Sequence, residues 1–241
     1  MDLFVANWKM NMTRAEARAY ARDLGEVLGD GDPAVELVIA PPFTAFEEAK
    51  DPRRRRWSLA AQNVASEKEG PYTGEISARM IADAGCRYVI VGHSERRRIF
   101  GEASPALAHK LARAREAGLI PIYCLGETEA EREEGLTTAT LTAQVETLAG
   151  DPADAPLVVA YEPIWAIGTG RAATPGDAGS ARALLADLLS NRRDLRILYG
   201  GSVSSGNAAP LLESAGVDGF LIGGASLKPR SFASIAGVSP A

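Results

Sequence analysis

Eight short apolar runs recur along this chain at intervals of about 31 residues, and this repetition restricts the possible folds more than any other feature of the sequence. They occupy residues 3–6, 37–40, 59–61, 88–91, 120–125, 157–161, 195–199 and 220–222. Apart from Arg196, the runs are apolar at consecutive positions, as expected of strands that are buried on both faces of a parallel sheet. The intervals are long enough for crossover helices, so the sequence predicts eight βα units.

Helix start and stop signals lie between several of these runs. The Thr-x-x-Glu pattern of a capping box begins at three positions, which are Thr13, Thr44 and Thr128. Ser104 and Thr174 each precede a proline, which predicts an N-cap followed by proline at the first helical position. Glycines follow three Ala-rich stretches and predict helix ends there: Gly85, Gly118 and Gly216.

Parallel strands that alternate with helices form either an open doubly wound sheet or a closed barrel. Eight units in about 250 residues match the barrel. Lys9 follows the first run, whereas Gly223 and Gly224 follow the last, and only closure brings these positions together. No linker-like change of composition divides the chain. The sequence therefore predicts an α/β protein in which residues 1–241 form a single domain, a closed (β/α)8 barrel.

Composition excludes several classes of protein. Lys and Arg total 26 and Asp and Glu total 31, a net charge of −5, which argues against a nucleic-acid partner. The arginine run at 53–56 is interpreted as a solvated charge cluster. Two cysteines and two histidines leave little for a zinc site, so no metal is expected. No apolar run is long enough to span a membrane, and Asp2 and Lys9 do not suit a signal peptide. We expect a cytoplasmic protein.

Two basic side chains stand directly after strands. A lysine such as Lys9 often snorkels at a strand end, but at the carboxyl end of a barrel strand a cation is well placed to stabilise negative charge on a substrate oxygen. His93 follows Gly92 at a helix start, where the helix dipole disfavours the imidazolium form. A satisfied core histidine is the simpler alternative. His109 lies in a helical pattern, and Cys124 lies within a strand; we expect no catalytic role for either.

Glu162 follows the sixth run directly and precedes Pro163, which stiffens the backbone beside it. A structural cap is the alternative to catalysis at this position. The following loop is apolar at 164–167 and then contains Gly168 and Gly170. Such a loop suits a lid that closes over a site and excludes water.

Glycine pairs follow the seventh and eighth runs, at 200–201 and 223–224. Glycine pairs are usually turns. After the last two strands of a barrel, however, their backbone N–H groups commonly bind phosphate, and Ser202 is placed to add a hydroxyl donor.

Several sequence blocks occur in a characteristic order. They are Ala-Asn-Trp-Lys-Met-Asn (6–11), Ala-Gln-Asn (61–63), Thr-Gly-Glu-Ile-Ser (73–77), Gly-His-Ser-Glu-Arg-Arg (92–97), Cys-Leu-Gly-Glu (124–127), Tyr-Glu-Pro-Ile-Trp-Ala-Ile-Gly-Thr-Gly (161–170), Tyr-Gly-Gly-Ser-Val (199–203) and Gly-Phe-Leu-Ile-Gly-Gly-Ala-Ser-Leu (219–227). With these blocks the chain resembles the triosephosphate isomerase family from residue 3 to residue 232. The resemblance implies a TIM barrel that interconverts dihydroxyacetone phosphate and D-glyceraldehyde 3-phosphate in glycolysis and gluconeogenesis, through an enediolate and without a metal or organic cofactor.

The resemblance also implies roles for individual residues. This family is itself the standard example of a glutamate base beside a neutral histidine electrophile, so these roles follow from the resemblance. Glu162 would be the base, His93 the electrophile and Lys9 the electrostatic partner, with Asn7 in the oxyanion network and Glu95 orienting Lys9. The substrate would be held by Asn7, Lys9, Gly168, Ser202, Gly223 and Gly224. The lid would comprise Pro163, Ile164, Trp165, Ala166, Ile167, Gly168, Thr169 and Gly170.

The resemblance further implies a homodimer, formed through the 64–75 loop with its tip at Thr73-Gly74-Glu75. Three positions depart from the common pattern of the family. Arg171-Ala172-Ala173 end the lid where Lys-Thr-Ala is common, Pro71 replaces an alanine in the interface loop, and Ser104 stands where an acidic helix cap is usual.

Two other functions are compatible with these residues. One is a phosphosugar aldolase that uses Lys9 as a Schiff base. The other is a non-catalytic phosphometabolite-binding protein that retains the fold.

Overall fold

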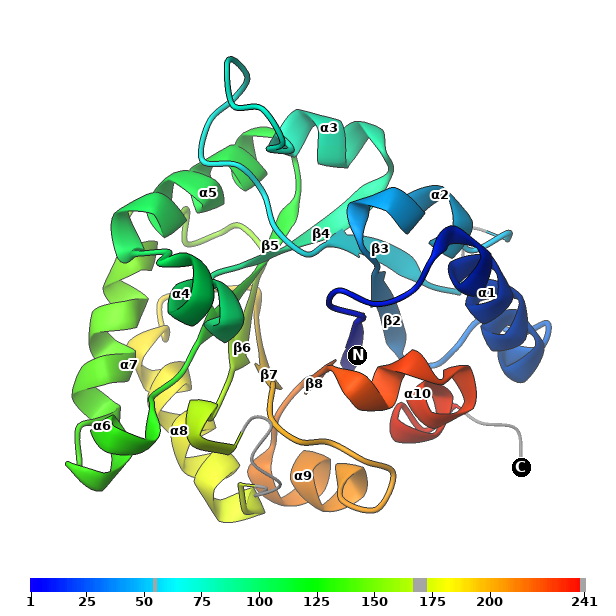
Figure 1. Ribbon diagram of the computed structural model, residues 1–241. Helices are drawn as coiled ribbons and strands as arrows, with labels where there is room; N and C mark the ends of the chain where they lie inside the picture. Colours follow the sequence, from blue (N-terminus) through cyan, green and yellow to red (C-terminus); the bar gives the residue numbers. More distant parts are fainter. Residues whose placement is uncertain (54–55, 167–172, 239–241) are drawn as a thin grey trace.

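The computed structural model describes residues 1–53, 56–166 and 173–238. Its strands are β1 (Leu3–Asn7), β2 (Glu36–Ala40), β3 (Ser58–Ala61), β4 (Cys86–Val91), β5 (Ile120–Leu125), β6 (Leu157–Tyr161), β7 (Leu195–Tyr199) and β8 (Gly219–Ile222). Each coincides with a predicted apolar run to within two residues at either end. The strands pair in parallel in chain order, and β1 also pairs with β8, so the sheet closes into a barrel (Figure 1). The prediction of a closed (β/α)8 barrel is confirmed.

Helices surround the barrel. The α-helices are α1 (Arg14–Leu28), α2 (Phe46–Ala49), α3 (Ala78–Asp83), α4 (Ser94–Phe100), α5 (Ser104–Glu116), α6 (Glu129–Glu133), α7 (Thr137–Val145), α8 (Pro175–Leu188), α9 (Ala208–Ala215) and α10 (Pro229–Ile235). The 3-10 helices are η1 (Phe43–Ala45), η2 (Glu146–Leu148), η3 (Ile164–Ala166) and η4 (Gly224–Leu227). Within the described residues no helix has the length and apolar character needed to cross a bilayer.

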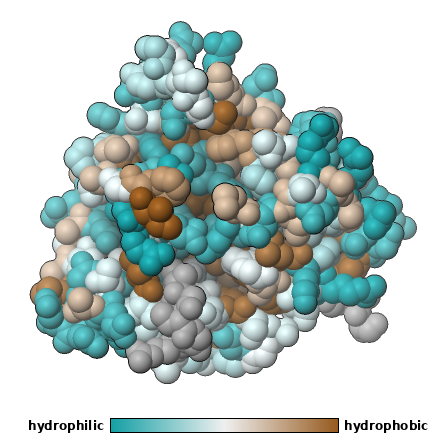
Figure 2. Space-filling view, viewed as in Figure 1, coloured by the Kyte–Doolittle hydropathy of each residue, from teal (hydrophilic) through white to brown (hydrophobic). Residues whose placement is uncertain are grey.

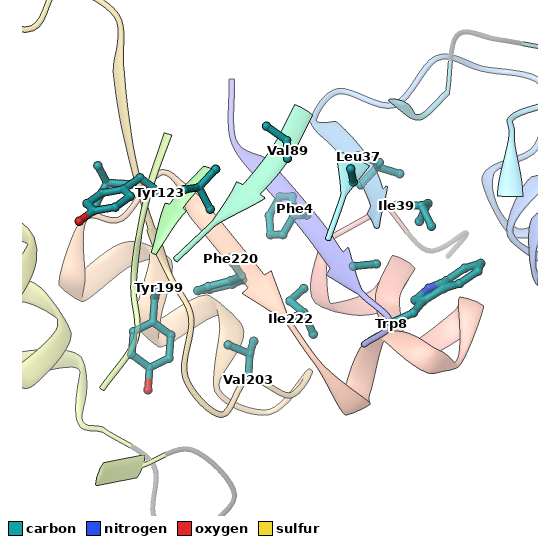
Figure 3. Close-up of a cluster of buried hydrophobic side chains, with 14 of the residues drawn as sticks. Phe4, Trp8, Leu37, Ile39, Val89, Tyr123, Tyr199, Val203, Phe220 and Ile222 are labelled. Carbon is teal, nitrogen blue, oxygen red and sulfur yellow. The ribbon is translucent and has the colours of Figure 1, made fainter. Parts of the chain in front are cut away.

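Alternation along the strands divides the core into two layers. Leu3 and Val5 of β1 point into the barrel, where they join a cluster composed of strand residues such as Leu198. Phe4 of β1 points outward to a second cluster that packs against the helices. In Figure 3, Phe4 and Phe220 lie side by side on neighbouring strands, with ring centroids 5.7 Å apart. Strands buried on both sides explain why the runs are apolar at nearly every position, with Arg196 of β7 as the exception.

Most helix signals act as predicted. Thr13 and Thr128 each form a capping box, and Thr174 caps α8 in the same way with Pro175 in the first turn. The Thr44 prediction is wrong, because the chain after Pro42 turns into η1 and no side chain caps α2. The Ser104 prediction is also wrong. Ser104 is the first residue of α5, and Ala103, which cannot accept a hydrogen bond through its side chain, occupies the N-cap.

The arginine run at 53–56 is not uniformly solvated, which corrects the prediction for Arg56. Its side chain is buried and lies 2.8 Å from the carboxylate of Asp51. It also donates to the carbonyl of Gly25 at the end of α1. A buried cation requires such partners, and they come from segments that the local sequence does not reveal. Arg53 is exposed, whereas Arg54 and Arg55 lie outside the described residues.

Candidate active site

The predicted site residues come from the carboxyl ends of five strands. Lys9 follows β1, His93 follows β4, Glu162 follows β6, Ser202 follows β7 and Gly223 follows β8. All five line one cavity of about 420 Å³, together with Asn7, Glu95, Arg98, Gly200, Gly201 and Gly224. The end of the first strand and the end of the last meet there, as closure predicts. A Cβ atom on Gly223 would lie 3.2 Å from Cε of Lys9.

Lys9 is held in an unusual backbone conformation. Its φ of 52° lies in the left-handed region, which costs a residue with a side chain about 1 kcal/mol. Two hydrogen bonds hold it there: the Lys9 N–H donates to Oδ1 of Asn7 at 3.0 Å, and Gln62 donates to the Lys9 carbonyl at 2.9 Å. Its ammonium group then reaches Oε1 of Glu95 at 2.6 Å. Such local strain is typical of a side chain that the fold must place accurately.

Glu95 is the anionic partner of this lysine. Burial raises the pKa of the Glu95 carboxyl group, but the hydrogen bond and charge of Lys9, with the charges of His93 and Arg98, hold it below its ordinary value. The Glu95 carboxyl group therefore remains ionised at neutral pH, and the predicted contact between Lys9 and Glu95 is present.

His93 is the N-cap of α4, and this position determines which ring nitrogen carries a proton. The backbone N–H of Glu95 donates to Nδ1 of His93 at 3.2 Å, so Nδ1 is an acceptor and Nε2 is the protonated nitrogen. Nε2 lies 3.0 Å from Oε1 of Glu162. The arrangement presents a ring N–H toward the cavity.

Two opposing effects act on the pKa of His93. Burial, the largest single effect, lowers the pKa, but the charge and hydrogen bond of Glu162, together with the charge of Glu95, outweigh it, so the pKa lies above its ordinary value. This direction opposes the neutral imidazole predicted for His93, and a shift of the Glu162 carboxylate away from the ring would remove the larger part of the raising effect.

Glu162 is almost completely buried, and both of its carboxylate oxygens are engaged. Oε2 accepts a hydrogen bond from the Ser94 N–H at 2.8 Å, and Oε1 faces Nε2 of His93. Its backbone is fixed by the bond from its own N–H to the carbonyl of Leu125 on the neighbouring strand, at 2.7 Å. A buried carboxylate that lines the cavity from a fixed backbone is well suited to proton transfer.

Gly200, the first residue of the first glycine pair, has a different role from the one predicted. The N–H of Gly200 donates to the carbonyl of Tyr161 at 2.7 Å and is therefore not available to a phosphate. A Cβ at position 200 would lie 3.0 Å from Cγ of Glu162, and one at position 201 would lie 2.2 Å from the hydroxyl of Tyr199. These glycines make room for the base and for a core tyrosine.

Ser202 and the second glycine pair do line the cavity. Oγ of Ser202 lies 3.4 Å from the carbonyl of Ala166, so this hydroxyl lies beside the beginning of the predicted lid. A Cβ on Gly224 would meet open space. The predicted site residue Gly168 lies outside the described residues, as do Ile167, Thr169 and Gly170 and the departures at Arg171 and Ala172.

A buried carboxylate that the sequence analysis did not assign holds the start of the predicted lid. Oε1 of Glu127, which follows β5, accepts from the Trp165 indole at 2.9 Å and from the Tyr161 hydroxyl at 3.0 Å. Arg132 of α6 lies over the Trp165 ring at 4.3 Å and pairs with Asp177 of α8 at 2.6 Å. The only sequence signal for this cluster was an acidic residue directly after a strand.

The remaining candidates lie away from the cavity or in the core. His109 is exposed on α5. Cys124 is completely buried inside the barrel, where burial raises the pKa of its thiol well above the usual range. Within residues 1–53, 56–166 and 173–238, no three His, Cys, Asp or Glu side chains are grouped so that they could hold a metal ion.

The fold and the cavity define a class of protein: a (β/α)8-barrel enzyme with a buried carboxylate, a histidine N–H and a lysine around a cavity of the size of a small substrate. The family model described as triosephosphate isomerase matches residues 2–239. The chain belongs to the triosephosphate isomerase family.

Curated relatives agree with this assignment. A protein of Symbiobacterium thermophilum named triosephosphate isomerase is 46% identical over 97% of this chain and 94% of its own length. Proteins of the same name from Alcanivorax borkumensis and from Chlorobium phaeobacteroides strain BS1 are 43% and 46% identical, each over 97% of this chain and 96% of its own length.

Proposed function

We propose that this chain is an isomerase that interconverts dihydroxyacetone phosphate and D-glyceraldehyde 3-phosphate in glycolysis and gluconeogenesis. The family and the curated relatives support this activity. One observation carries the assignment of roles: Glu162, His93 and Lys9 come from three separate strands and line the same cavity. Residues 1–241 act as one domain in this proposal, and no cofactor takes part.

The proposed reaction moves one proton between neighbouring carbons. The Glu162 carboxylate rotates away from the Ser94 N–H and accepts the proton from the carbon beside the carbonyl group. The electrons of that C–H bond form a carbon–carbon double bond, and the carbonyl oxygen becomes an enediolate oxygen. Glu162 then returns the proton to the adjacent carbon, while the hydroxyl proton on the first carbon passes through His93 to the enediolate oxygen, so that the first carbon becomes the new carbonyl carbon. The burial of Glu162 and its two replaceable hydrogen bonds support this role.

Charge on the enediolate needs donors already in place, because such preorganisation is a main source of catalysis. His93 donates its Nε2 proton toward the substrate oxygens, and the acceptor role of Nδ1 supports this assignment. Lys9 supplies a positive charge, and Glu95 orients it at 2.6 Å. Asn7 lines the same cavity and fixes the backbone of Lys9, so it contributes to the oxyanion network.

The phosphate is proposed to lie against the backbone of Gly223 and Gly224, beside Lys9, and against the hydroxyl of Ser202. Gly168 is proposed to add an N–H from the lid. The lid runs from Pro163 to Gly170. We propose that Trp165 fixes the start of this lid, because its indole N–H donates a hydrogen bond to Glu127.

The partner is proposed to be a second copy of this chain. Residues 64–75 connect β3 to α3 and project from the body of the molecule as the cyan loop in Figure 1. Tyr72 is 47% exposed within this loop, and Ile99 and Phe100 expose apolar surface on α4, where Figure 2 shows hydrophobic atoms gathered. Burial of these groups would favour association.

We further propose a cytoplasmic location, consistent with a glycolytic role, and no nucleic-acid or membrane partner.

An aldolase reaction through Lys9 is less well supported. A Schiff base needs a free amine at the substrate, whereas Nζ of Lys9 is engaged by Glu95. A coupled assay with purified protein and each triose phosphate tests the proposed activity. Turnover in both directions without a cofactor is the expected result. Binding without isomerisation, or trapping of substrate on Lys9 by borohydride, would contradict it.

A further inference from the structure

Arg98 contributes a cation to the cavity that none of the roles above uses. It lies near the end of α4, three residues after Glu95, so both side chains are on the same side of the helix. It lines the cavity with Lys9 and Glu162. Arg98 is exposed, and toward the other residues that the structure describes its guanidinium makes no hydrogen bond or close ion pair. It is therefore available to a ligand.

The charges around the cavity show why this cation matters. Four charged side chains line it among the described residues: Lys9 and Arg98 are cationic, and Glu95 and Glu162 are anionic. With His93 neutral they sum to zero, and without Arg98 they would sum to −1. A phosphate monoester carries about −1.5 to −2 at neutral pH, so a net negative cavity would repel it.

Lys9 alone does not offset this repulsion. Its ammonium lies 2.6 Å from the Glu95 carboxylate, so at longer range the two charges largely cancel. Glu162 must carry its negative charge to act as a base. The remaining phosphate contacts, backbone N–H groups and the Ser202 hydroxyl, are neutral and act only at short range. Among the charged cavity residues that the structure describes, this leaves Arg98 as the cation that can act on an approaching anion.

We propose that Arg98 recruits the substrate: its guanidinium attracts the phosphate group of the triose phosphate into the cavity without touching the reacting carbon atoms. A charge at the mouth of a cleft raises the local concentration of a charged substrate and the rate of encounter. Guanidinium is suited to this because it is weakly hydrated and matches phosphate oxygens in geometry. The inference rests on the proposed isomerase activity.

The test is the ionic-strength dependence of kcat/KM for D-glyceraldehyde 3-phosphate in Arg98→Gln. At low ionic strength we expect kcat/KM to fall about three- to tenfold, the effect of one unit charge on a dianion at several ångströms in water. At about 0.5 M salt, where the screening length is only a few ångströms, the two proteins should converge. The value of kcat should change less than about twofold, because the chemical step is untouched.

Three further variants sharpen the result. Arg98→Lys keeps the charge and should retain most of kcat/KM, and Arg98→Glu should lower it further, by about 10- to 100-fold at low salt. Arg193→Gln removes an equal charge from an exposed arginine just before β7, at the amino end of the barrel, and should change nothing. The inhibition constant of inorganic phosphate should rise in Arg98→Gln by a factor similar to the fall in kcat/KM.

Several outcomes would overturn the inference. One is an unchanged kcat/KM with the same salt dependence in Arg98→Gln. Another is a fall in kcat that persists at high salt. Such a fall would show that Arg98 acts on the chemical step by positioning Glu95, and not on the encounter with substrate. Arg98→Met, a second neutral variant, must behave as Arg98→Gln does, and light scattering must show the same assembly state in every variant. Absence of isomerisation by the unsubstituted chain would contradict the proposed function, a result distinct from any of these.

Discussion

Nε2 of His93 lies 3.0 Å from Oε1 of Glu162, although the two residues follow strands that are separated by β5 in the barrel. The contact forms because both side chains project over the carboxyl end of the barrel, and because the Ser94 N–H holds the second carboxylate oxygen at 2.8 Å. In the proposed reaction the carboxylate leaves this donor to reach the substrate, and its reach is set by the length of its side chain.

Glu162→Asp should therefore retain the fold and lose most of its activity. The carboxylate would retreat by about one methylene, and a displacement of about 1 Å can lower a rate about 100-fold. The measurement is kcat/KM in a coupled isomerase assay, with circular dichroism as the control for folding. A well-folded variant with near-normal turnover would show that Glu162 is not the base.

Replacement of residues 164–170 by a short Gly-Ser link should change the products as well as the rate. An enediolate carries its phosphate on the adjacent carbon and eliminates it when the C–O bond aligns with the double bond. A closed lid prevents that alignment and excludes water. We expect slower isomerisation and a larger share of methylglyoxal and inorganic phosphate among the products. Unchanged partitioning in a folded, active variant would mean that this segment is not a lid.

The proposed homodimer predicts that Tyr72→Asp weakens self-association, because it places a charge on the projecting loop. Leu136→Asp makes a comparable change at an exposed apolar residue between α6 and α7, away from the loop, and should leave association intact. Light scattering on the eluting protein gives the mass directly. A fully active species of 25.4 kDa at assay concentrations would rule out the dimer as a requirement.

Gly126→Ala should be strongly destabilising. A Cβ at this position would lie 1.7 Å from the backbone carbonyl oxygen of Glu162, so the end of β6 must move. Overpacking of this kind costs about 1–3 kcal/mol or more, and activity should fall with the displaced base. Gly150→Ala is the matched control, since its Cβ would meet nothing within 4 Å. The free energy of unfolding, measured in urea, should be lower for Gly126→Ala than for Gly150→Ala. Equal free energies for these two variants would contradict the packing argument.

Glu36 predicts a specific loss of stability in acid. Burial raises the pKa of its carboxyl group, but hydrogen bonds from Tyr88 and Arg196, at 2.6 Å each, lower the pKa below its ordinary 4.5. A carboxyl group whose pKa is lower in the folded than in the unfolded state stabilises the protein at pH values above its unfolded-state pKa. This contribution is lost as the pH falls through the folded-state pKa. The free energy of unfolding should therefore fall below about pH 4.5.

Glu36→Gln removes the titrating group, so its free energy of unfolding should depend less on pH in this acid range than that of the unsubstituted protein. It should also be lower at pH 7, because Arg196 loses its partner. Glu213→Gln, at an exposed carboxylate on α9, should follow the original curve. Parallel curves for Glu36→Gln and the unsubstituted chain would exclude Glu36 as a source of the acid sensitivity.

The barrel could be predicted from sequence because its eight strands are short, mostly apolar and separated by enough residues for a helix, and the candidate residues followed from their place after those strands. Side-chain partners could not be predicted. Gly200 is indistinguishable by sequence from a phosphate-binding glycine, yet its N–H is occupied by Tyr161. Arg56 gives no local sign of its burial beside Asp51. Glu127 follows β5, and its contact with the predicted lid depends on a hydrogen bond from Trp165, which follows β6.

The meeting of Lys9 with Gly223 has a consequence for the newly made chain. The cavity spans the junction between β1 and β8, where β8 approaches so closely that a Cβ on Gly219 would lie 1.9 Å from the carbonyl oxygen of Leu3. During synthesis the first strand emerges long before the last, and the lysine has no partner strand on that side until β8 arrives. The capacity to bind a triose phosphate is therefore acquired late and all at once, when the ring of strands is completed. A substrate that binds only the completed ring would also stabilise it over partly folded states by mass action.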